Sequence, residues 1–119
     1  MADILIVDDE AVALRILQHA LRKQGHRVQS ASNGEEALLI AQKSQFDLMI
    51  LDISMPRMDG VELLQHIREL DSNTSTPVIM LTASSQDEDR VRAENSGANL
   101  YMTKPFSSQK INEAVESLL

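Results

Sequence analysis

Three acids, a threonine and a lysine in this sequence have the types and spacing needed for phosphoryl chemistry. Asp8, Asp9 and Asp52 each follow a run of apolar residues, and Thr82 and Lys104 follow two further runs. Three carboxylates brought together repel one another, and a hard divalent cation such as Mg²⁺ relieves that repulsion. With a hydroxyl donor and an ammonium group nearby, one aspartate is suited to act as the nucleophile in phosphoryl transfer.

These side chains can act together only if the fold brings them to one place. Residues 4–7, 48–51 and 77–81 are continuous apolar runs, the pattern of strands covered on both faces. Weaker strands are predicted at residues 27–31, in an edge position, and at 100–102. Helical stretches separate the strands, which favours parallel pairing with right-handed crossovers. The five residues named above then meet at the carboxyl edge of the sheet, where such folds bind ligands.

The spacing of apolar residues predicts five helices. Leu14, Leu17 and Leu21 recur at helical spacing, and Gly25 is expected to end that helix. Asn33 is predicted to cap the second helix, and Asp59 to act as a cap or turn residue before the third. The predicted inward-facing residues of the second and third helices are Ala37, Leu38, Ala41, Val61, Leu64 and Ile67.

The last two helices differ strongly in their apolar content. The fourth, at residues 86–96, is nearly all polar, with Val91 and Ala93 as its main apolar anchors. We therefore expect its amides to exchange hydrogen fastest among the helices. The last helix is strongly amphipathic, with a predicted buried face of Ile111, Ala114, Val115, Leu118 and Leu119.

Length and composition narrow the class of protein. The 119 residues, 43% of them hydrophobic, suit one folded domain spanning 1–119. A net charge of −7 argues against direct nucleic-acid binding, and the absence of cysteine excludes disulfides and thiolate metal sites. No apolar run is long enough to cross a membrane, and no basic stretch precedes an apolar one at the start. The expected location is the cytoplasm.

The order of the motifs resembles the receiver domain of bacterial response regulators, the phosphoacceptor proteins of two-component systems. The resemblance covers essentially the whole chain. It implies a flavodoxin-like, doubly wound α/β fold with five parallel strands and five helices. The strand order 2-1-3-4-5 is carried over from the chemotaxis member of the family. The residues that carry the resemblance are Asp8-Asp9, Asp52, Met55-Pro56, Met58-Asp59-Gly60, Thr82-Ala83 and Lys104-Pro105-Phe106.

The resemblance implies a role for each residue of the metal site. Asp52 would accept a phosphoryl group from a phosphohistidine on a sensor histidine kinase or a histidine phosphotransfer protein. Asp9 would bind Mg²⁺ directly and Asp8 through water, with Asp52 and the backbone carbonyl of Ser54 as further ligands. Such a protein is a signalling switch that assists its own phosphorylation and dephosphorylation rather than an enzyme with a separate substrate.

The resemblance also implies how the switch is transmitted. Thr82 would hydrogen-bond the phosphoryl group, Lys104 would pair with it, and the Lys104–Pro105 peptide would be cis. Tyr101 would turn inward behind Thr82 and change the face formed by the fourth helix, fifth strand and fifth helix, where a downstream effector binds. Small serines flank the site, at Ser54 and at position 84, so we expect little obstruction of a hydrolytic water.

Two other protein classes compete with this interpretation. A Mg²⁺-dependent phosphatase also uses an aspartyl nucleophile, but its usual acids lie two residues apart, whereas Asp8 and Asp9 are adjacent. A flavodoxin-like electron carrier shares the fold but should stack aromatic side chains on its flavin. The only aromatic residues here are Phe46, Tyr101 and Phe106.

No output domain is expected after the last helix, which favours a stand-alone regulator, with a fragment or a phosphorelay intermediate as alternatives. Regulators with a winged-helix output often carry acids before the strand-five aromatic and basic residues in the last helix. Here Asn99 and Leu100 precede Tyr101, and Lys110 is the only basic residue of the last helix. This disfavours the dimer that winged-helix regulators form through these residues. We expect a monomer or a phosphorylation-dependent homodimer.

Overall fold

The computed structural model describes residues 1–83 and 87–119, without the side chains of residues 87–90. In this part of the chain, parallel strands form one sheet in the order β2-β1-β3-β4-β5, which confirms the expected order. The edge position of the weaker strand β2 is also confirmed. The strands are β1 (Asp3–Val7), β2 (Arg27–Ala31), β3 (Leu48–Asp52), β4 (Val78–Thr82) and β5 (Leu100–Thr103).

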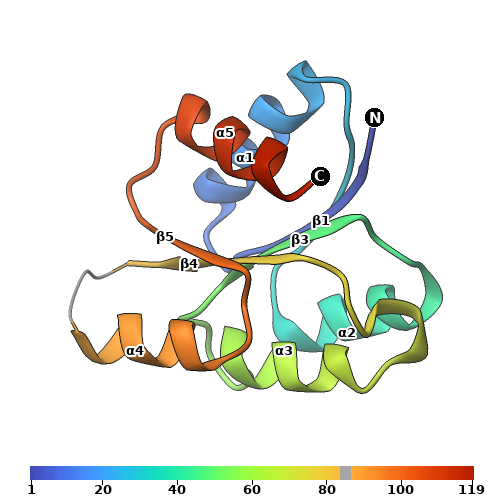
Figure 1. Cartoon of the computed structure of the whole chain (residues 1–119), viewed down its shortest axis with the longest axis vertical. Helices are drawn as coiled ribbons and strands as arrows, with labels where there is room; N and C mark the ends of the chain where they lie inside the picture. The colour runs from blue at the N-terminus through green and yellow to red at the C-terminus, as the bar shows by residue number, and fades with distance from the viewer. Residues whose placement is uncertain (84–86) are drawn as a thin grey trace.

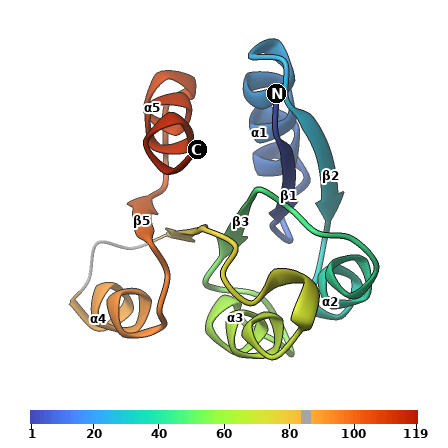
Figure 2. The ribbon, with the colours of Figure 1, turned by 45° about the vertical axis from the view of Figure 1, so that its right-hand side comes forward.

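Helices cover both faces of the sheet. Figure 1 and Figure 2 show α1 and α5 on one face, with α2, α3 and α4 on the other. A short 3₁₀ helix, η1, which was not predicted, precedes β4. The helices are α1 (Ala11–Lys23), α2 (Gly34–Lys43), α3 (Gly60–Arg68), η1 (Asp71–Asn73), α4 (Asp87–Asn95) and α5 (Ser108–Leu118).

Alternation along the strands separates two apolar cores. All five residues of β3 are buried, as expected for a central strand covered on both faces. Leu5, Met49 and Met80 pack in the core beneath α2 and α3. Ile4 and Ile50 pack in the other core, with residues of α1 and α5. The sheet is thereby held from both sides, which fixes the positions of the strand ends.

The helix ends form where the sequence predicted them. Gly25 adopts a φ of +91° just after α1, a conformation that glycine tolerates and other residues rarely adopt. The Asn33 side chain accepts a hydrogen bond from the Glu36 amide at 2.8 Å, which confirms it as the α2 cap. Asp59 caps α3 in the same way, through the Glu62 amide at 3.0 Å.

The prediction of burial was wrong for two residues. Val91 of α4 is 46% exposed, and Leu119 at the end of α5 is 50% exposed. Ala93 is fully buried and anchors α4 as predicted. An alanine methyl offers little apolar area, so the described side chains of α4, residues 91–95, make only a small apolar contact with the sheet. None of the described helices is long and apolar enough to span a membrane.

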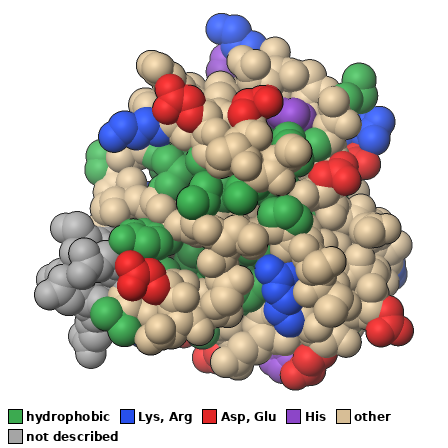
Figure 3. All heavy atoms as spheres, viewed as in Figure 1, with side chains coloured by type: hydrophobic (Ala, Val, Ile, Leu, Met, Phe, Trp, Pro, Cys, Tyr) green, Lys and Arg blue, Asp and Glu red, His purple; other side chains and the backbone are tan. Residues whose placement is uncertain are grey.

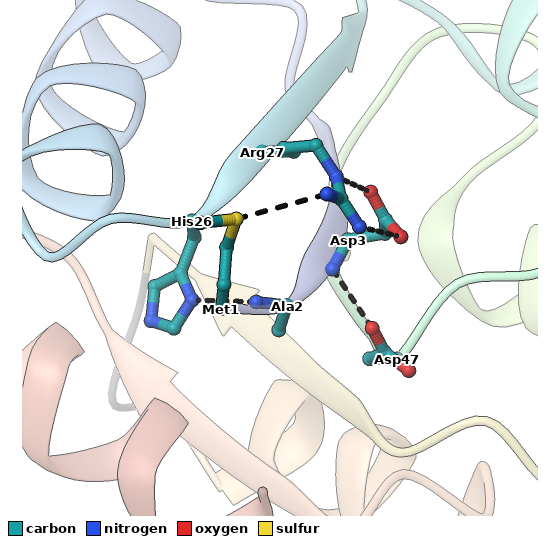
Figure 4. Close-up of polar contacts among 6 residues, drawn as sticks. All are labelled: Met1, Ala2, Asp3, His26, Arg27 and Asp47. Atoms are coloured by element: carbon teal, nitrogen blue, oxygen red, sulfur yellow. Dashed lines mark hydrogen bonds and ion pairs between the residues drawn. The ribbon is translucent and has the colours of Figure 1, made fainter.

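Polar contacts fix the amino-terminal edge of the sheet, at the opposite end from the carboxyl strand ends (Figure 4). Arg27 binds Asp3 through two nitrogens, at 2.6 and 2.8 Å, and joins the start of β2 to the start of β1. The Asp3 amide donates to Asp47 at 2.8 Å, and the Ala2 amide donates to His26 Nδ1 at 3.1 Å. These bonds help to set the register in which the opposite strand ends meet.

Candidate functional site

The predicted site residues meet at the carboxyl edge of the sheet because the strands pair in register. Val7 pairs with Leu51, which places Asp8 beside Asp52, the last residue of β3. Leu81 pairs with Asp52, so Thr82 follows at the next position of β4. Asp8, Asp52 and Thr82 are almost completely buried, with exposures of 0%, 2% and 1%. Asp9 is exposed beside them.

The two buried carboxylates are held in the same way. Asp8 Oδ1 accepts a hydrogen bond from the Glu10 amide at 2.9 Å, and Asp52 Oδ1 accepts one from the Ser54 amide at 3.2 Å. Each aspartate is thus oriented by the backbone two residues further along. The second oxygen of each carboxylate faces Lys104, whose Nζ lies 2.7 Å from Asp8 Oδ2 and 3.5 Å from Asp52 Oδ2.

Lys104 supplies the positive charge of the site. Its side chain is 13% exposed, and its ammonium also lies 3.0 Å from Glu10 Oε1. Burial alone acts to lower the pKa of Lys104, but its contacts with the Asp8 and Glu10 carboxylates and the charge of Asp52 outweigh burial, so the pKa is raised. The side chain therefore keeps its proton and its charge throughout the physiological range.

The acceptor candidate Asp52 has an unusually high pKa for an aspartate. Burial, followed by the negative charge of Asp8, raises its pKa to about 7, against the opposing effects of the Ser54 amide and Lys104. A carboxylate attacks phosphorus only in its ionised form. A further cation at the site would favour that form and so prepare Asp52 as a nucleophile.

The acidic side chains also fit a divalent cation. Among the described residues, Asp8, Asp9, Glu10 and Asp52 each offer a carboxylate oxygen, and these oxygens all lie within 4.8 Å of one another. Asp8 Oδ2 is buried and receives no well-directed hydrogen bond, although the Lys104 ammonium lies close to it. An all-oxygen donor set of this kind suits Mg²⁺.

The sequence prediction omitted Glu10 from this cluster. The signal was present, because three acids follow one another directly after β1, but the third lay outside the motif that carried the family resemblance. Ser54 enters the site through its amide, and its role as a carbonyl ligand stays a prediction. Position 84, the second flanking serine, lies outside the described residues.

The segment after Asp52 packs tightly against it. A Cβ atom on Gly60 would clash with the Asp52 carbonyl oxygen, so only glycine fits at the start of α3. The Gly60 amide donates to the Ile53 carbonyl at 3.0 Å, which closes the turn. The N-terminus of α3 therefore packs directly against the backbone of Asp52.

The loop that carries Lys104 is joined to the end of β4. The Lys104 amide donates to the Thr82 carbonyl at 2.7 Å, and the Lys104–Pro105 peptide is cis, as the resemblance implied. Tyr101 lies on the edge strand β5, paired with Met80 of β4, and is 37% exposed. Thr82 and Tyr101 therefore lie on neighbouring strands, with Thr82 buried and Tyr101 partly open to solvent.

Comparison with known families agrees with this arrangement. The family model described as the response regulator receiver domain matches residues 4–116. The chain belongs to the response-regulator receiver family. Membership of this family favours a signalling switch over the electron-carrier and phosphatase alternatives.

The curated relatives extend beyond the receiver domain. Over 116 residues the chain is 40% identical to the alkaline phosphatase synthesis transcriptional regulatory protein PhoP of Bacillus subtilis and 39% identical to the transcriptional regulatory protein ResD of the same organism. Each match covers 98% of this chain but 48% and 47% of the relative. The chain thus spans about half the length of these curated relatives.

Solved receiver structures match along nearly their whole length. The chemotaxis response regulator CheY4 of Vibrio cholerae has a TM-score of 0.93 and 34% identity, covering 100% of this chain and 99% of that one. The receiver domain of sensor histidine kinase PA1611 from Pseudomonas aeruginosa has a TM-score of 0.92 and 28% identity, covering 98% and 96%. The PA1611 receiver domain has a magnesium ion coordinated in its active-site cleft.

Proposed function

We propose that Asp52 accepts a phosphoryl group from a phosphohistidine of a sensor kinase or histidine phosphotransfer protein, with Mg²⁺ as the cofactor. The observation that carries this proposal is the position of Asp52 within the acidic cluster and beside Lys104. Asp52 is buried, its pKa is raised to about 7, and Lys104 lies 3.5 Å away. A group in such an environment is a candidate for covalent chemistry rather than a surface charge.

Asp8, Asp9 and Asp52, with the Ser54 carbonyl, would hold the metal ion. When bound, Mg²⁺ neutralises charge on the transferring phosphoryl oxygens and favours ionised Asp52. The fit rests on the four clustered carboxylates, of which Asp8 and Asp52 are buried. The PA1611 receiver domain, of the same family, supports this choice of metal.

In the transfer step, an ionised Asp52 carboxylate oxygen attacks the phosphorus atom. A P–O bond to Asp52 forms as the P–N bond to the donor imidazole breaks, and the bonding pair returns to the imidazole nitrogen. Lys104 then pairs with a phosphoryl oxygen, and the Thr82 hydroxyl donates a hydrogen bond to another. Water then attacks the same phosphorus, the P–O bond to Asp52 breaks with its electron pair returning to the carboxylate, and the phosphoryl group leaves as inorganic phosphate together with the protons of the water.

Phosphorylation would then alter the surface formed by α4, β5 and α5. The phosphoryl group carries about −1.5 to −2 charges in place of the single charge of the ionised Asp52 carboxylate, and this larger charge draws Thr82 and Lys104 toward it. Leu100 and Tyr101 of β5 are each 37% exposed, and Figure 3 shows hydrophobic side chains gathered on this face, between the upper helices and α4. An inward turn of Tyr101 would change this surface and so its affinity for a downstream effector.

The partners follow from this chemistry only in part. A phosphohistidine donor and an effector protein are proposed. Since the relatives named above are transcriptional regulators, the comparisons give no support to the expectation that the protein avoids nucleic acid. A cytoplasmic location and a monomer or phosphorylation-dependent homodimer stay predictions.

Nuclear magnetic resonance with Mg²⁺ and beryllofluoride, which mimics a phosphoryl group, tests the proposal. We expect saturable binding that shifts the amides of Asp52, Thr82 and Lys104 and, beyond them, those of α4, β5 and α5. The Asp52→Asn variant serves as control and should not bind beryllofluoride. Binding that is unchanged in the variant, or no binding to the unaltered protein, would overturn the proposed function.

A further inference from the structure

The Lys104 ammonium is shared among three carboxylates at unequal distances. It lies 2.7 Å from Asp8, 3.0 Å from Glu10 and 3.5 Å from the acceptor Asp52. An ammonium group has three protons to donate. The shortest contacts are therefore made to the two acids that flank the acceptor, and the longest contact is made to the acceptor itself.

Glu10 contacts Lys104 from the N-cap position of α1, where a side chain ordinarily caps the helix. It is the N-cap residue of α1, yet its carboxylate makes no capping hydrogen bond in the described part of the chain. It is directed instead to Lys104, 94 residues further along. Glutamate is not among the preferred N-cap residues, so helix capping does not explain its presence here.

Asp8 and Glu10 differ in how easily each can release the lysine. Asp8 is fully buried, so water cannot solvate its carboxylate in place of Lys104, and only another cation could replace the lysine there. The Glu10 side chain is 64% exposed, so water can solvate its carboxylate once Lys104 has left. Glu10 is therefore the partner that can give way when a stronger anion forms at Asp52.

We infer that Glu10 is a positioning residue that holds Lys104 in its resting place and competes with the phosphoryl group for it. Phosphorylation of Asp52 brings new acceptor oxygens with a larger charge, and Lys104 leaves Glu10 to pair with them. Glu10 thereby sets how readily the site passes from its resting to its phosphorylated arrangement. This inference rests on the proposed function, since it assigns a regulator to the same site.

The experiment compares beryllofluoride and Mg²⁺ affinities in three variants of the whole chain. Glu10→Ala removes both the charge and the contact. Glu10→Asp keeps the charge but shortens the side chain so that it no longer reaches Lys104. Glu69→Gln removes one exposed acid at the far end of α3 and is the charge-matched control.

We expect both Glu10 variants to bind beryllofluoride about two- to fivefold more tightly than the unaltered protein at saturating Mg²⁺, the effect of a partly exposed ion pair. Affinity for Mg²⁺ alone should change less than twofold, and Glu69→Gln should match the unaltered protein. A merely structural role for Glu10 would change thermal stability without tightening beryllofluoride binding.

Each other outcome contradicts the inference. Tighter binding in Glu10→Ala but not in Glu10→Asp would show an effect of net charge and not of the contact with Lys104. A tenfold loss of Mg²⁺ affinity in Glu10→Ala would make Glu10 a metal ligand. Unchanged beryllofluoride affinity in both variants overturns only this inference, whereas no binding to the unaltered protein overturns the proposed function with it.

Discussion

The Lys104 ammonium lies 2.7 Å from the carboxylate of Asp8, which is fully buried at the end of β1. The two residues are 96 positions apart in the sequence, and only the formation of the sheet brings them together. Their ion pair joins the first strand to the loop after the last one. Because this ion pair links two elements of the fold, substitutions in the site should also change the free energy of unfolding.

Replacing Lys104 with methionine should destabilise the metal-free protein. The change leaves Asp8 and Asp52 buried without their cation, and we expect the free energy of unfolding to fall by about 2–4 kcal/mol. Mg²⁺ should recover part of the loss. Urea unfolding in chelator and in Mg²⁺ measures both effects, with Lys110→Met on the exposed face of α5 as the control. Equal stability of the two variants would contradict the pairing.

Stability should fall as pH rises in the absence of metal. The pKa of Asp52 is about 7 in the folded protein, against 3.8 for an ordinary aspartate. Because the folded pKa is the higher one, the unfolded chain gives up this proton first, and stability is lost between about pH 4 and pH 7. Asp52→Asn removes this titration and should be more stable than the unaltered protein at pH 8 by about 1–3 kcal/mol.

Urea unfolding of both proteins at pH 5 and pH 8, in chelator, measures the difference. The two proteins should be closer in stability at pH 5, where Asp52 is protonated in the folded state. A gap of the same size at both pH values would show that Asp52 is ionised throughout and that its burial does not raise its pKa.

The ion pair between Asp59 and Arg92 should couple α3 to α4. Arg92 lies 2.6 Å from Asp59 Oδ2, while Asp59 Oδ1 caps α3. Asp59→Asn keeps a capping oxygen but removes the charge. Combined with Arg92→Gln in a double-mutant cycle, it measures the interaction energy of the ion pair separately from the cap. Both side chains are partly exposed, and we expect a coupling energy of about 0.3–1 kcal/mol that diminishes in high salt. Additive effects of the two changes would rule out the coupling.

Helix α4 should be the least protected helix in hydrogen exchange. Ala93 is its buried anchor, and Val91, which was expected to help, is 46% exposed. The small apolar contact predicts low local stability and the largest change in exchange on beryllofluoride binding. Residue-resolved exchange with and without Mg²⁺ and beryllofluoride measures it. Equal protection of α4 and α5 would contradict the prediction.

The site could be predicted from the sequence because its residues follow apolar strands. In a parallel sheet the carboxyl ends of the strands share an edge, so Asp8, Asp52, Thr82 and Lys104 had to meet there once the strands were recognised. The caps Asn33 and Asp59 were predictable for a similar reason, since capping depends on neighbouring residues in the sequence.

Other features depended on packing that local sequence does not determine. Whether Val91 or Ala93 faces the core depends on how α4 is rotated against the sheet, and a helix with so few apolar residues gives little periodicity to indicate it. The contact of Glu10 with Lys104 spans 94 residues and replaces a capping role. The pair of Arg92 with Asp59 likewise joins side chains from two separate helices.

The central claim, that Asp52 is the phosphoryl acceptor and depends on Mg²⁺, is tested most directly by intact-protein mass spectrometry after incubation with acetyl phosphate. We predict one added phosphoryl group on the unaltered protein in Mg²⁺, and none in chelator or in Asp52→Ala. An adduct that persists in Asp52→Ala, or the absence of any adduct in Mg²⁺, would contradict it.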